Sequence, residues 1–223
     1  MTTVGFIGSG HIGSTAARLS VAAGYHVILS NSRGPETLTE LAGELGSLAV
    51  AATAEQAAGG GDIVVVTIPF HAYQSVPASP LAAKPVIDTC NYSPQRDGQI
   101  AELDSGSVTS SELIQRHLTG ARVVKAFNNI FYQHLLSLSR PSGAADRSFL
   151  PIAGDDADAK AEVTAFLDAI GYGAVDVGPL AESWRQEPGT PVYGPPYGSF
   201  SDPAGTPASE ATIRAALSAA SRG

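Results

Sequence analysis

The sequence is poor in cysteine, in positive charge and in long apolar stretches, and each shortage excludes a class of protein. Its 223 residues contain one cysteine, Cys90, which excludes an intramolecular disulfide framework and a cysteine-rich metal site. The 13 Lys and Arg residues stand against 21 Asp and Glu residues, and the resulting net charge of −8 argues against binding nucleic acid. The longest apolar runs, such as residues 63–68, are far shorter than the roughly 20 residues that span a bilayer.

Two further absences narrow the function. The N-terminus enters an apolar strand with no basic flank and no cleavage site, so we expect no signal peptide and a soluble cytoplasmic protein. No serine stands in a nucleophile elbow, and the histidines lack metal-ligand spacing: His11, His26, His71, His117 and His134. We therefore expect no metal site, no hydrolase chemistry, and a small molecule rather than nucleic acid or membrane as the partner.

Apolar segments of strand length alternate with Ala-rich segments of helical length, which is typical of a parallel sheet covered by helices on both faces. Strands are expected near residues 4–8, 26–30, 47–51, 63–68, 85–89, 122–126, 149–153 and 174–177. Helices are expected near residues 12–23, 35–45, 54–58, 73–79, 110–118, 129–136, 157–170 and 208–220. The sequence thus predicts an α/β fold.

Glycine and proline are abundant in one late segment. Residues 187–198 cannot sustain a helix or a central strand and predict a stiff loop that carries aromatic side chains. We expect two parts: residues 1–178 form a dinucleotide-binding domain with its sheet extension, and residues 179–223 form a small appendage of this aromatic loop and a C-terminal helix.

A glycine motif follows the first strand and opens the first helix. Gly8-Ser9-Gly10-His11-Ile12-Gly13 fits the G-x-G-x-x-G pattern within a unit of about 30 residues. Gly8 permits a tight turn, Gly10 lets the backbone approach a pyrophosphate, and Gly13 lets the helix pack closely on the strand. The motif predicts a doubly wound Rossmann-type sheet with a dinucleotide at this turn. We expect His11 to be neutral and to line the cofactor, because the helix dipole disfavours a cation there.

The end of the second strand favours NADP(H) over NAD(H). An NAD site usually places Asp or Glu about 20 residues after the first glycine. Here Asn31-Ser32-Arg33 contains no carboxylate. Ser32 can donate to a 2′-phosphate, and Arg33 can pair with it and stack on adenine. The alternative is that Arg33 is a solvated loop charge.

Two later strand ends should border the same ligand. Ligands of doubly wound sheets bind outside the carboxyl ends of the strands. The fourth strand ends at Thr67 and Pro69, and the fifth leads into Asn91. We expect these three residues to hold the ribose and nicotinamide, with strand termination as the alternative for Pro69.

Four motifs together resemble those of the NADPH-dependent F-420 reductase family, also called F-420:NADP oxidoreductase. They are the phosphate turn, Asn31-Ser-Arg33, Thr67-Ile-Pro69 and the segment Val123-Val-Lys-Ala-Phe-Asn-Asn-Ile130. The resemblance covers residues 1–188 and implies a homodimer with direct hydride transfer between NADP(H) and a deazaflavin, coenzyme F-420. It places the 2′-phosphate clamp on Ser32 and Arg33. It places the wall beside the nicotinamide on Lys125, Phe127, Asn128 and Ile130.

Of two departures from the family, the first softens the expected preference for NADP(H) and the second leaves the acceptor open. Thr37 stands where the family has a lysine, and the aromatic tail with Trp184 is longer than in the family. An imine or carbonyl acceptor would need a proton donor, and the candidates are Tyr92, His134, Tyr193 and Tyr197. A protein that binds NADP(H) and senses its redox state without catalysis is a further alternative. Cys90 is expected to be a small buried hydrophobe.

Overall fold

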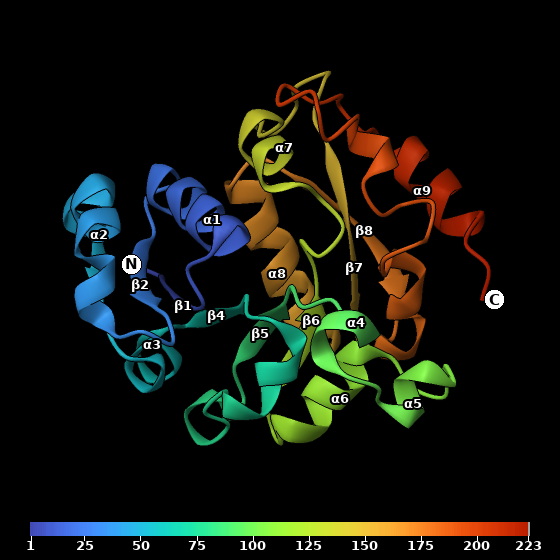
Figure 1. Ribbon diagram of the computed structural model, residues 1–223. Helices are drawn as coiled ribbons and strands as arrows, with labels where there is room; N and C mark the ends of the chain where they lie inside the picture. The colour runs from blue at the N-terminus through green and yellow to red at the C-terminus, as the bar shows by residue number, and fades with distance from the viewer. Residues whose placement is uncertain (223) are drawn as a thin grey trace.

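The computed structural model describes residues 1–222 and contains one sheet of eight strands in the order β3-β2-β1-β4-β5-β6-β7-β8 (Figure 1). The strands are β1 (Thr3–Ile7), β2 (His26–Ser30), β3 (Ala49–Ala51), β4 (Ile63–Val66), β5 (Pro85–Asp88), β6 (Arg122–Lys125), β7 (Phe149–Gly154) and β8 (Gly173–Gly178). All eight strands therefore occur where the apolar segments predict them.

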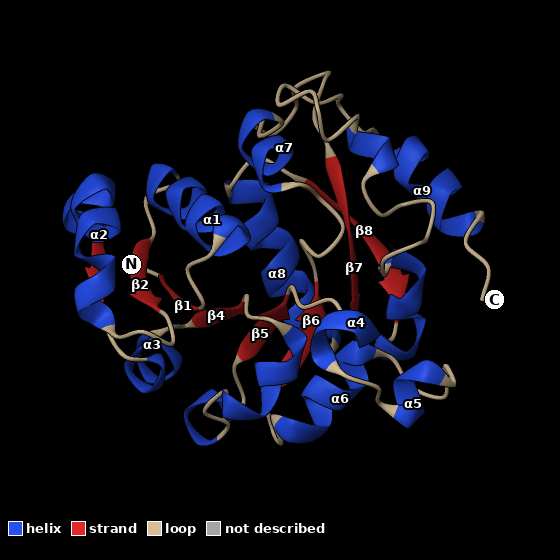
Figure 2. Cartoon of the chain, in the orientation of Figure 1, coloured by secondary structure: helices blue, strands red, loops and turns tan. Residues whose placement is uncertain are grey.

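The helices alternate with the strands along most of the chain (Figure 2). They are α1 (His11–Ala22), α2 (Thr39–Leu45), α3 (Ala54–Gly60), α4 (Pro94–Asp97), α5 (Ala101–Asp104), α6 (Ser110–His117), α7 (Tyr132–Ser137), α8 (Ala157–Ala169) and α9 (Glu210–Ser218). The helix expected at residues 73–79 is instead a 3₁₀ helix at Phe70–Ser75, and α4 and α5 were not predicted. In the part of the chain that the structure describes, no helix is long and apolar enough to cross a membrane.

Both faces of the sheet are buried, which confirms the doubly wound α/β fold. Strand β4 is apolar at every position, and its side chains alternate between two cores. Ile63 and Val65 join the core that includes Ala16 of α1 and Val163 of α8. Val64 and Val66 join the core that contains Ala57 of α3 and residues of α6. A strand that faces apolar helices on both sides has no polar positions, which explains its continuous apolar run.

The sheet is not parallel throughout. Strands β1 to β6 are parallel, but β7 pairs antiparallel with β6 and parallel with β8. The chain leaves β6 at its carboxyl end and enters β7 from that same edge, by way of α7, without crossing over the sheet. The expectation of a parallel sheet therefore fails at β7 and β8, because alternation of elements does not reveal which edge a connection returns to.

The C-terminal segment covers the β7 and β8 end of the sheet. After β8 come a 3₁₀ helix at Leu180–Gln186, the aromatic loop, a short 3₁₀ turn at Pro195–Tyr197 and helix α9. Tyr197 is fully buried, and its hydroxyl donates to the Phe149 carbonyl at 2.9 Å. Ile213 of α9 joins the same core as α1 and α8. In Figure 1 this red segment lies at the far side from the N-terminal strands.

A buried ion pair links β5 to β6 beneath the strand ends. Lys125 and Asp88 are both fully buried, and the Lys125 Nζ lies 3.2 Å from Asp88 Oδ2. The ammonium also donates to the Cys90 carbonyl and, at 3.1 Å, to Ser110 Oγ. Asp88 accepts from Ser111 of α6 at 2.7 Å. A buried charge of this kind is stable only when the oppositely charged and hydrogen-bonding groups around it are present.

We predict that Lys125→Met lowers the free energy of unfolding by about 3–5 kcal/mol, because it leaves the Asp88 carboxylate buried without its cation. The double variant Lys125→Met with Asp88→Leu should recover part of that loss. Urea unfolding of both variants and the parent measures it. A cost below about 1 kcal/mol for the single variant would show that the pair contributes little.

Candidate functional site

The turn between β1 and α1 is shaped by glycines at two positions. Gly8 has a φ of +105°, and a Cβ placed on it would lie 2.1 Å from the Thr67 carbonyl oxygen at the end of β4. A Cβ on Gly13 would lie 2.4 Å from the Gly8 carbonyl oxygen. These two glycines therefore hold the turn against β4 and the helix against the turn, as the motif predicts.

Gly10 is different, because a Cβ placed on it would meet nothing within 4 Å. It is exposed, and its conformation, φ −74° and ψ −163°, suits any residue. It lies at the N-terminus of α1 with no side-chain cap. The first backbone N–H groups of a helix have no partner within the helix and attract anions. The open space above Gly10 fits a pyrophosphate approaching the backbone.

A cavity of about 520 Å³ runs from this turn to the ends of β2 and β4. It brings together three groups of residues from distant parts of the sequence: Gly8, Ser9 and Gly10; Asn31, Ser32 and Arg33; Thr67, Ile68, Pro69, His71, Ala72 and Ser75. Ser9 donates to the Ser30 carbonyl at 2.9 Å and so ties the turn to β2. Eight of the residues expected at the cofactor thus share one cavity.

The loop after β2 is held by its own side chains and leaves its arginine free. Asn31 Oδ1 accepts from the Arg33 backbone N–H at 2.9 Å, and Asn31 Nδ2 donates to Thr37 Oγ1 at 2.9 Å. Thr37 donates in turn to the Gly34 carbonyl at 2.8 Å. Within residues 1–222 the Arg33 guanidinium makes no hydrogen bond or ion pair, although it lines the cavity.

The rim of the cavity beyond β4 carries a small charged cluster. Asp97 accepts from His71 Nδ1 at 3.1 Å, and it pairs with Arg96 at 2.8 Å. Burial opposes ionisation of Asp97, but the bonds from Arg96, the Ser93 N–H and His71 outweigh it and lower the pKa of this carboxyl below its usual value. The carboxylate therefore joins the loops that follow β4 and β5.

A chain of side-chain amides closes the carboxyl ends of β5 and β6. Asn91 Nδ2 donates to the Asn128 carbonyl at 2.8 Å, and Asn128 Nδ2 donates to Asn91 Oδ1 at 3.0 Å and to the Gln186 carbonyl at 2.7 Å. Gln186 Nε2 donates back to Asn128 Oδ1 at 2.9 Å. The predicted residues Asn91 and Asn128 thus fasten the start of the aromatic loop to the sheet.

Two residues of the expected nicotinamide wall are placed elsewhere. Lys125 is not free to contact a cofactor, because its ammonium is fully buried on Asp88, Ser110 and the Cys90 carbonyl. Phe127 is also fully buried and packs edge-on against Phe166. Its φ of +61° is rare for a bulky residue. Both support the turn that carries Asn128, and neither lines the cavity that reaches Arg33 or the small cavity at Ile12.

The four candidate proton donors have different environments in the structure. His134 and Tyr197 are fully buried, and Tyr197 donates to the Phe149 carbonyl. The Tyr92 hydroxyl is held by Asp104 at 2.7 Å and by the backbone of Gly98 and Ile100. Tyr193 alone of the four lines a cavity beside the first turn of α1.

That second cavity is small, about 150 Å³, and lies between α1, α7 and the aromatic loop. Ile12 and Tyr193 line it together with Asn129, Ile130, Phe131, Tyr132 and Phe200. Ile12 is two residues from Gly10, so the small cavity begins beside the phosphate turn. His11, next to Ile12, stacks on Tyr132 with ring centroids 4.4 Å apart.

Asn129, Tyr132, Gln186 and Phe200 are site residues that the sequence analysis missed. Asn129 lies within the motif segment that ends at Ile130, and Tyr132 lies two residues beyond that end, so the motif was an available indication for both. Gln186 and Phe200 come from the C-terminal segment. The 3₁₀ helix at Leu180–Gln186, which follows β8, leads that segment to the site, where Gln186 bonds Asn128.

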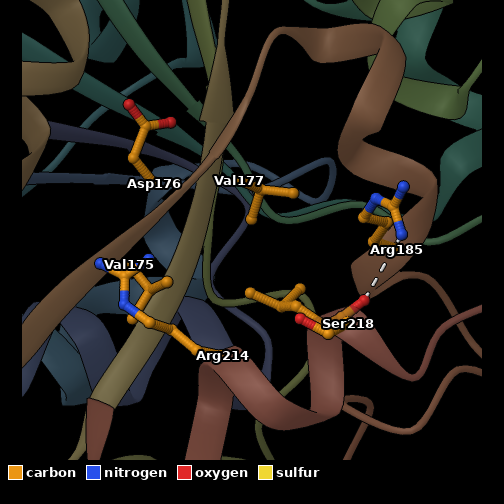
Figure 3. Close-up of a pocket in the computed structure, with 7 residues that line it drawn as sticks. Val175, Asp176, Val177, Arg185, Arg214 and Ser218 are labelled. Atoms are coloured by element: carbon orange, nitrogen blue, oxygen red, sulfur yellow. Dashed lines mark hydrogen bonds between the residues drawn. The ribbon is translucent and has the colours of Figure 1, made fainter. Parts of the chain in front are cut away.

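Other features of the described chain lie outside this site. Cys90 is buried, and burial together with nearby Asp88 raises the pKa of its thiol, which makes it a poor nucleophile. A cavity of about 500 Å³ lies between β8 and α9 (Figure 3). Its two arginines are already paired, Arg185 with Glu182 and Arg214 with Glu210, each at 2.7 Å. No group of three or more metal-binding side chains occurs among residues 1–222.

Comparison with known proteins relates the N-terminal part to one family. Residues 3–92 match the family model described as NADP oxidoreductase, coenzyme F420-dependent. The metalloreductase STEAP3 of Rattus norvegicus is 30% identical over 186 residues, which is 82% of this chain and 35% of that protein. The chain thus spans about a third of the length of this curated relative.

Solved structures agree with the fold. The protein SMa0349 of Sinorhizobium meliloti is 29% identical with a TM-score of 0.74, over 86% of this chain and 93% of its own. A crystal structure described as a putative F420-dependent NADP reductase from Arthrobacter sp. FB24 is 24% identical with a TM-score of 0.67, over 82% and 87%. At that identity the second likeness supports the fold alone.

We predict that Gly10→Ala and Gly8→Ala separate binding from stability. Gly10→Ala should leave thermal unfolding nearly unchanged, because its Cβ enters open space, and should weaken NADPH binding about tenfold or more by filling that space. Gly8→Ala should destabilise the fold by about 2–4 kcal/mol through its positive φ and its clash with β4. Calorimetric titration and unfolding curves test both. Unchanged NADPH affinity in Gly10→Ala would place the pyrophosphate elsewhere.

Proposed function

We propose that the chain transfers a hydride between NADP(H) and a deazaflavin coenzyme, F-420, or a similar small acceptor, because residues 3–92 match the family model described as NADP oxidoreductase, coenzyme F420-dependent. The family match supports the assignment as an NADP oxidoreductase, and the choice of acceptor is the finer part of the proposal. The homodimer expected from the resemblance stays a prediction.

The observation that carries the NADP(H) assignment is the free arginine at the end of β2. Of the 13 Lys and Arg side chains in the sequence, each of the other 12 makes an ion pair or a hydrogen bond within the described structure. Arg33 alone has neither, and it lines the cavity beside Ser32. A 2′-phosphate there would find a guanidinium with no carboxylate to displace.

The chain's own residues would bind and orient the cofactor rather than perform the reaction. The nicotinamide of a bound NADP(H) supplies the hydride. The Gly8–Gly10 turn and the N-terminus of α1 suit the pyrophosphate, and Ser32 and Arg33 suit the 2′-phosphate. The small cavity that begins at Ile12 lies on the other side of the turn and suits a ring. Hydride transfer needs chiefly the alignment of the nicotinamide ring with the acceptor.

An imine or carbonyl acceptor is the second candidate, and Tyr193 favours it. Its hydroxyl accepts a hydrogen bond from Asn91 Nδ2 at 3.4 Å, so its own proton is available. Burial raises the pKa of Tyr193 above its usual value of 10, which keeps the hydroxyl protonated at neutral pH. A ketone or imine that receives a hydride also needs a proton, which Tyr193 would donate in this second candidate reaction.

We predict that Arg33→Ala lowers NADPH affinity about tenfold to a hundredfold, the effect of losing charge-assisted bonds to a phosphate. NADH affinity should change by less than about twofold, because NADH has no 2′-phosphate. Arg116→Ala is the matched control, since Arg116 is an exposed arginine that pairs only with Glu102. An equal loss for NADPH and NADH would remove Arg33 from the 2′-phosphate site.

The acceptor is tested by following NADPH oxidation with coenzyme F-420, cyclic imines and quinones as a panel. We expect turnover with F-420 or with a small neutral ring. Turnover confined to imines or ketones, and lost in Tyr193→Phe, would favour the second candidate. NADPH binding with strong redox discrimination but no turnover of any acceptor would contradict both and favour a redox sensor.

A further inference from the structure

A cavity of about 440 Å³ lies between α5 with the loop that follows it and the 3₁₀ helix at Leu180–Gln186. It shares no lining residue with the cavity that reaches Arg33 or with the small cavity at Ile12. Three charged side chains line it, and they are Asp104, Glu187 and Arg222. Within residues 1–222 none of these three forms an ion pair. Two negative charges and one positive charge therefore leave the cavity short of one cation.

Arg222 shows which chemistry this cavity accepts. Its guanidinium carbon lies 5.1 Å from the centre of the Trp184 ring, which is a cation–π distance. Its Nη1 donates to the Gly106 carbonyl at 3.1 Å, and its Nη2 donates to the Ala181 carbonyl at 3.2 Å. An aromatic face beside two carbonyl acceptors suits the flat guanidinium, whose N–H groups point outward in its own plane. The cavity thus already holds one guanidinium group, and that group belongs to the chain itself.

The contacts of Arg222 are open to exchange with another guanidinium. Arg222 and the two residues whose carbonyls it contacts are exposed, and Trp184 is half-buried. Arg185 also lies against Trp184, with its guanidinium carbon at 4.5 Å, but it is held by Glu182 at 2.7 Å. No carboxylate holds Arg222 in the same way among the described residues. Hydrogen bonds at an exposed position contribute little net free energy, so Arg222 can leave without unfolding the chain.

Two carboxylates attract an incoming cation. Asp104 Oδ1 accepts from the Tyr92 hydroxyl at 2.7 Å, and Glu187 Oε1 accepts from Ser110 Oγ at 2.8 Å. The second oxygen of each carboxylate has no partner within the described part of the chain. Hydroxyl donors are neutral and leave the charge of both carboxylates uncompensated. A positively charged ligand therefore gains an attraction that a neutral one lacks.

We propose that this cavity binds a ligand with a guanidinium group, which takes the place of Arg222 against Trp184. Asp104 and Glu187 supply the opposite charge. The guanidinium can come from a small molecule or from an arginine of a peptide. Arg222 then acts as a competitor within the chain, which keeps the Trp184 face covered when no ligand is present. The inference goes beyond the proposed function and does not depend on it.

Trp184 is the only tryptophan of the sequence, so its fluorescence reports on this cavity directly. Arg222→Ala should respond to arginine amide with a saturable change in fluorescence. The parent should bind arginine amide about fivefold more weakly, because Arg222 competes from within the same chain. Citrulline amide, which has the shape of arginine without its charge, should bind about tenfold more weakly than arginine amide. Arg214→Ala is the matched control, since Arg214 is an exposed arginine that pairs with Glu210, and it should behave as the parent does.

A second change tests the role of charge. Asp104→Asn, made together with Arg222→Ala, keeps an acceptor for the Tyr92 hydroxyl and removes one negative charge. It should weaken the binding of arginine amide about threefold, the effect of one exposed charge pair. Agmatine and acetyl-Gly-Arg-Gly-amide distinguish the two sources of the group. Tighter binding of agmatine indicates a small molecule, tighter binding of the peptide indicates an arginine of a protein partner, and either result supports the proposal.

The absence of a saturable response of Arg222→Ala to arginine amide would overturn the proposal. An equal response to citrulline amide would overturn it too, and so would equal affinities in the parent and in Arg222→Ala. Thermal unfolding of Arg222→Ala and of the milder variant Arg222→Gln shows whether the fold is intact. Loss of the fold in both would also contradict the proposal, because it requires that Arg222 can leave the cavity.

Discussion

The contact between Gly8 and the Thr67 carbonyl is the constraint on which the site depends. It sets the β1 to α1 turn directly against the end of β4, at a distance that no side chain would permit. Because the turn is held there, the N-terminus of α1 faces outward over the strand ends and Gly10 is left open. The cavity that reaches Arg33 and the small cavity at Ile12 both begin from this one turn.

The reversal of β7 and β8 then determines what faces the turn. β8 runs opposite to β6, and its last residue, Gly178, pairs with Ala153, which in turn pairs with Lys125 at the carboxyl end of β6. The 3₁₀ helix at Leu180–Gln186 follows β8, and Gln186 bonds Asn128 at the carboxyl end of β6. The aromatic loop starts from that bond. Tyr193 and Phe200 therefore reach a cavity formed otherwise by residues from the N-terminal two thirds of the chain.

The sequence predicted those parts of the site whose geometry is determined within a short segment of the chain. The glycine turn, the Asn31–Arg33 loop and Thr67 follow from strand and turn chemistry within short segments, and the structure brings them to one cavity. Lys125 and Phe127 illustrate where such inference stops. Lys125 is the last residue of β6 and Phe127 follows the strand, where a ligand-binding residue is expected, but both side chains are buried in the interior. The position of a residue in a motif does not reveal whether its side chain faces the ligand site or the protein interior.

The distribution of charged side chains limits the choice of hydride acceptor more strongly than the fold limits it. A deazaflavin coenzyme with a phosphate and an acidic tail needs a cationic rim, and Arg33 is the one Lys or Arg side chain without a partner in the described chain. A tail bound elsewhere would compete with backbone carbonyls at Lys84 or Arg222, or would displace a carboxylate from an arginine such as Arg96. The bidentate pair of Arg96 with Asp97 also anchors His71. Breaking that pair would loosen the rim of the cofactor cavity itself. A compact, neutral acceptor incurs no such cost, and the uncharged aromatic walls around Asn129 suit it better.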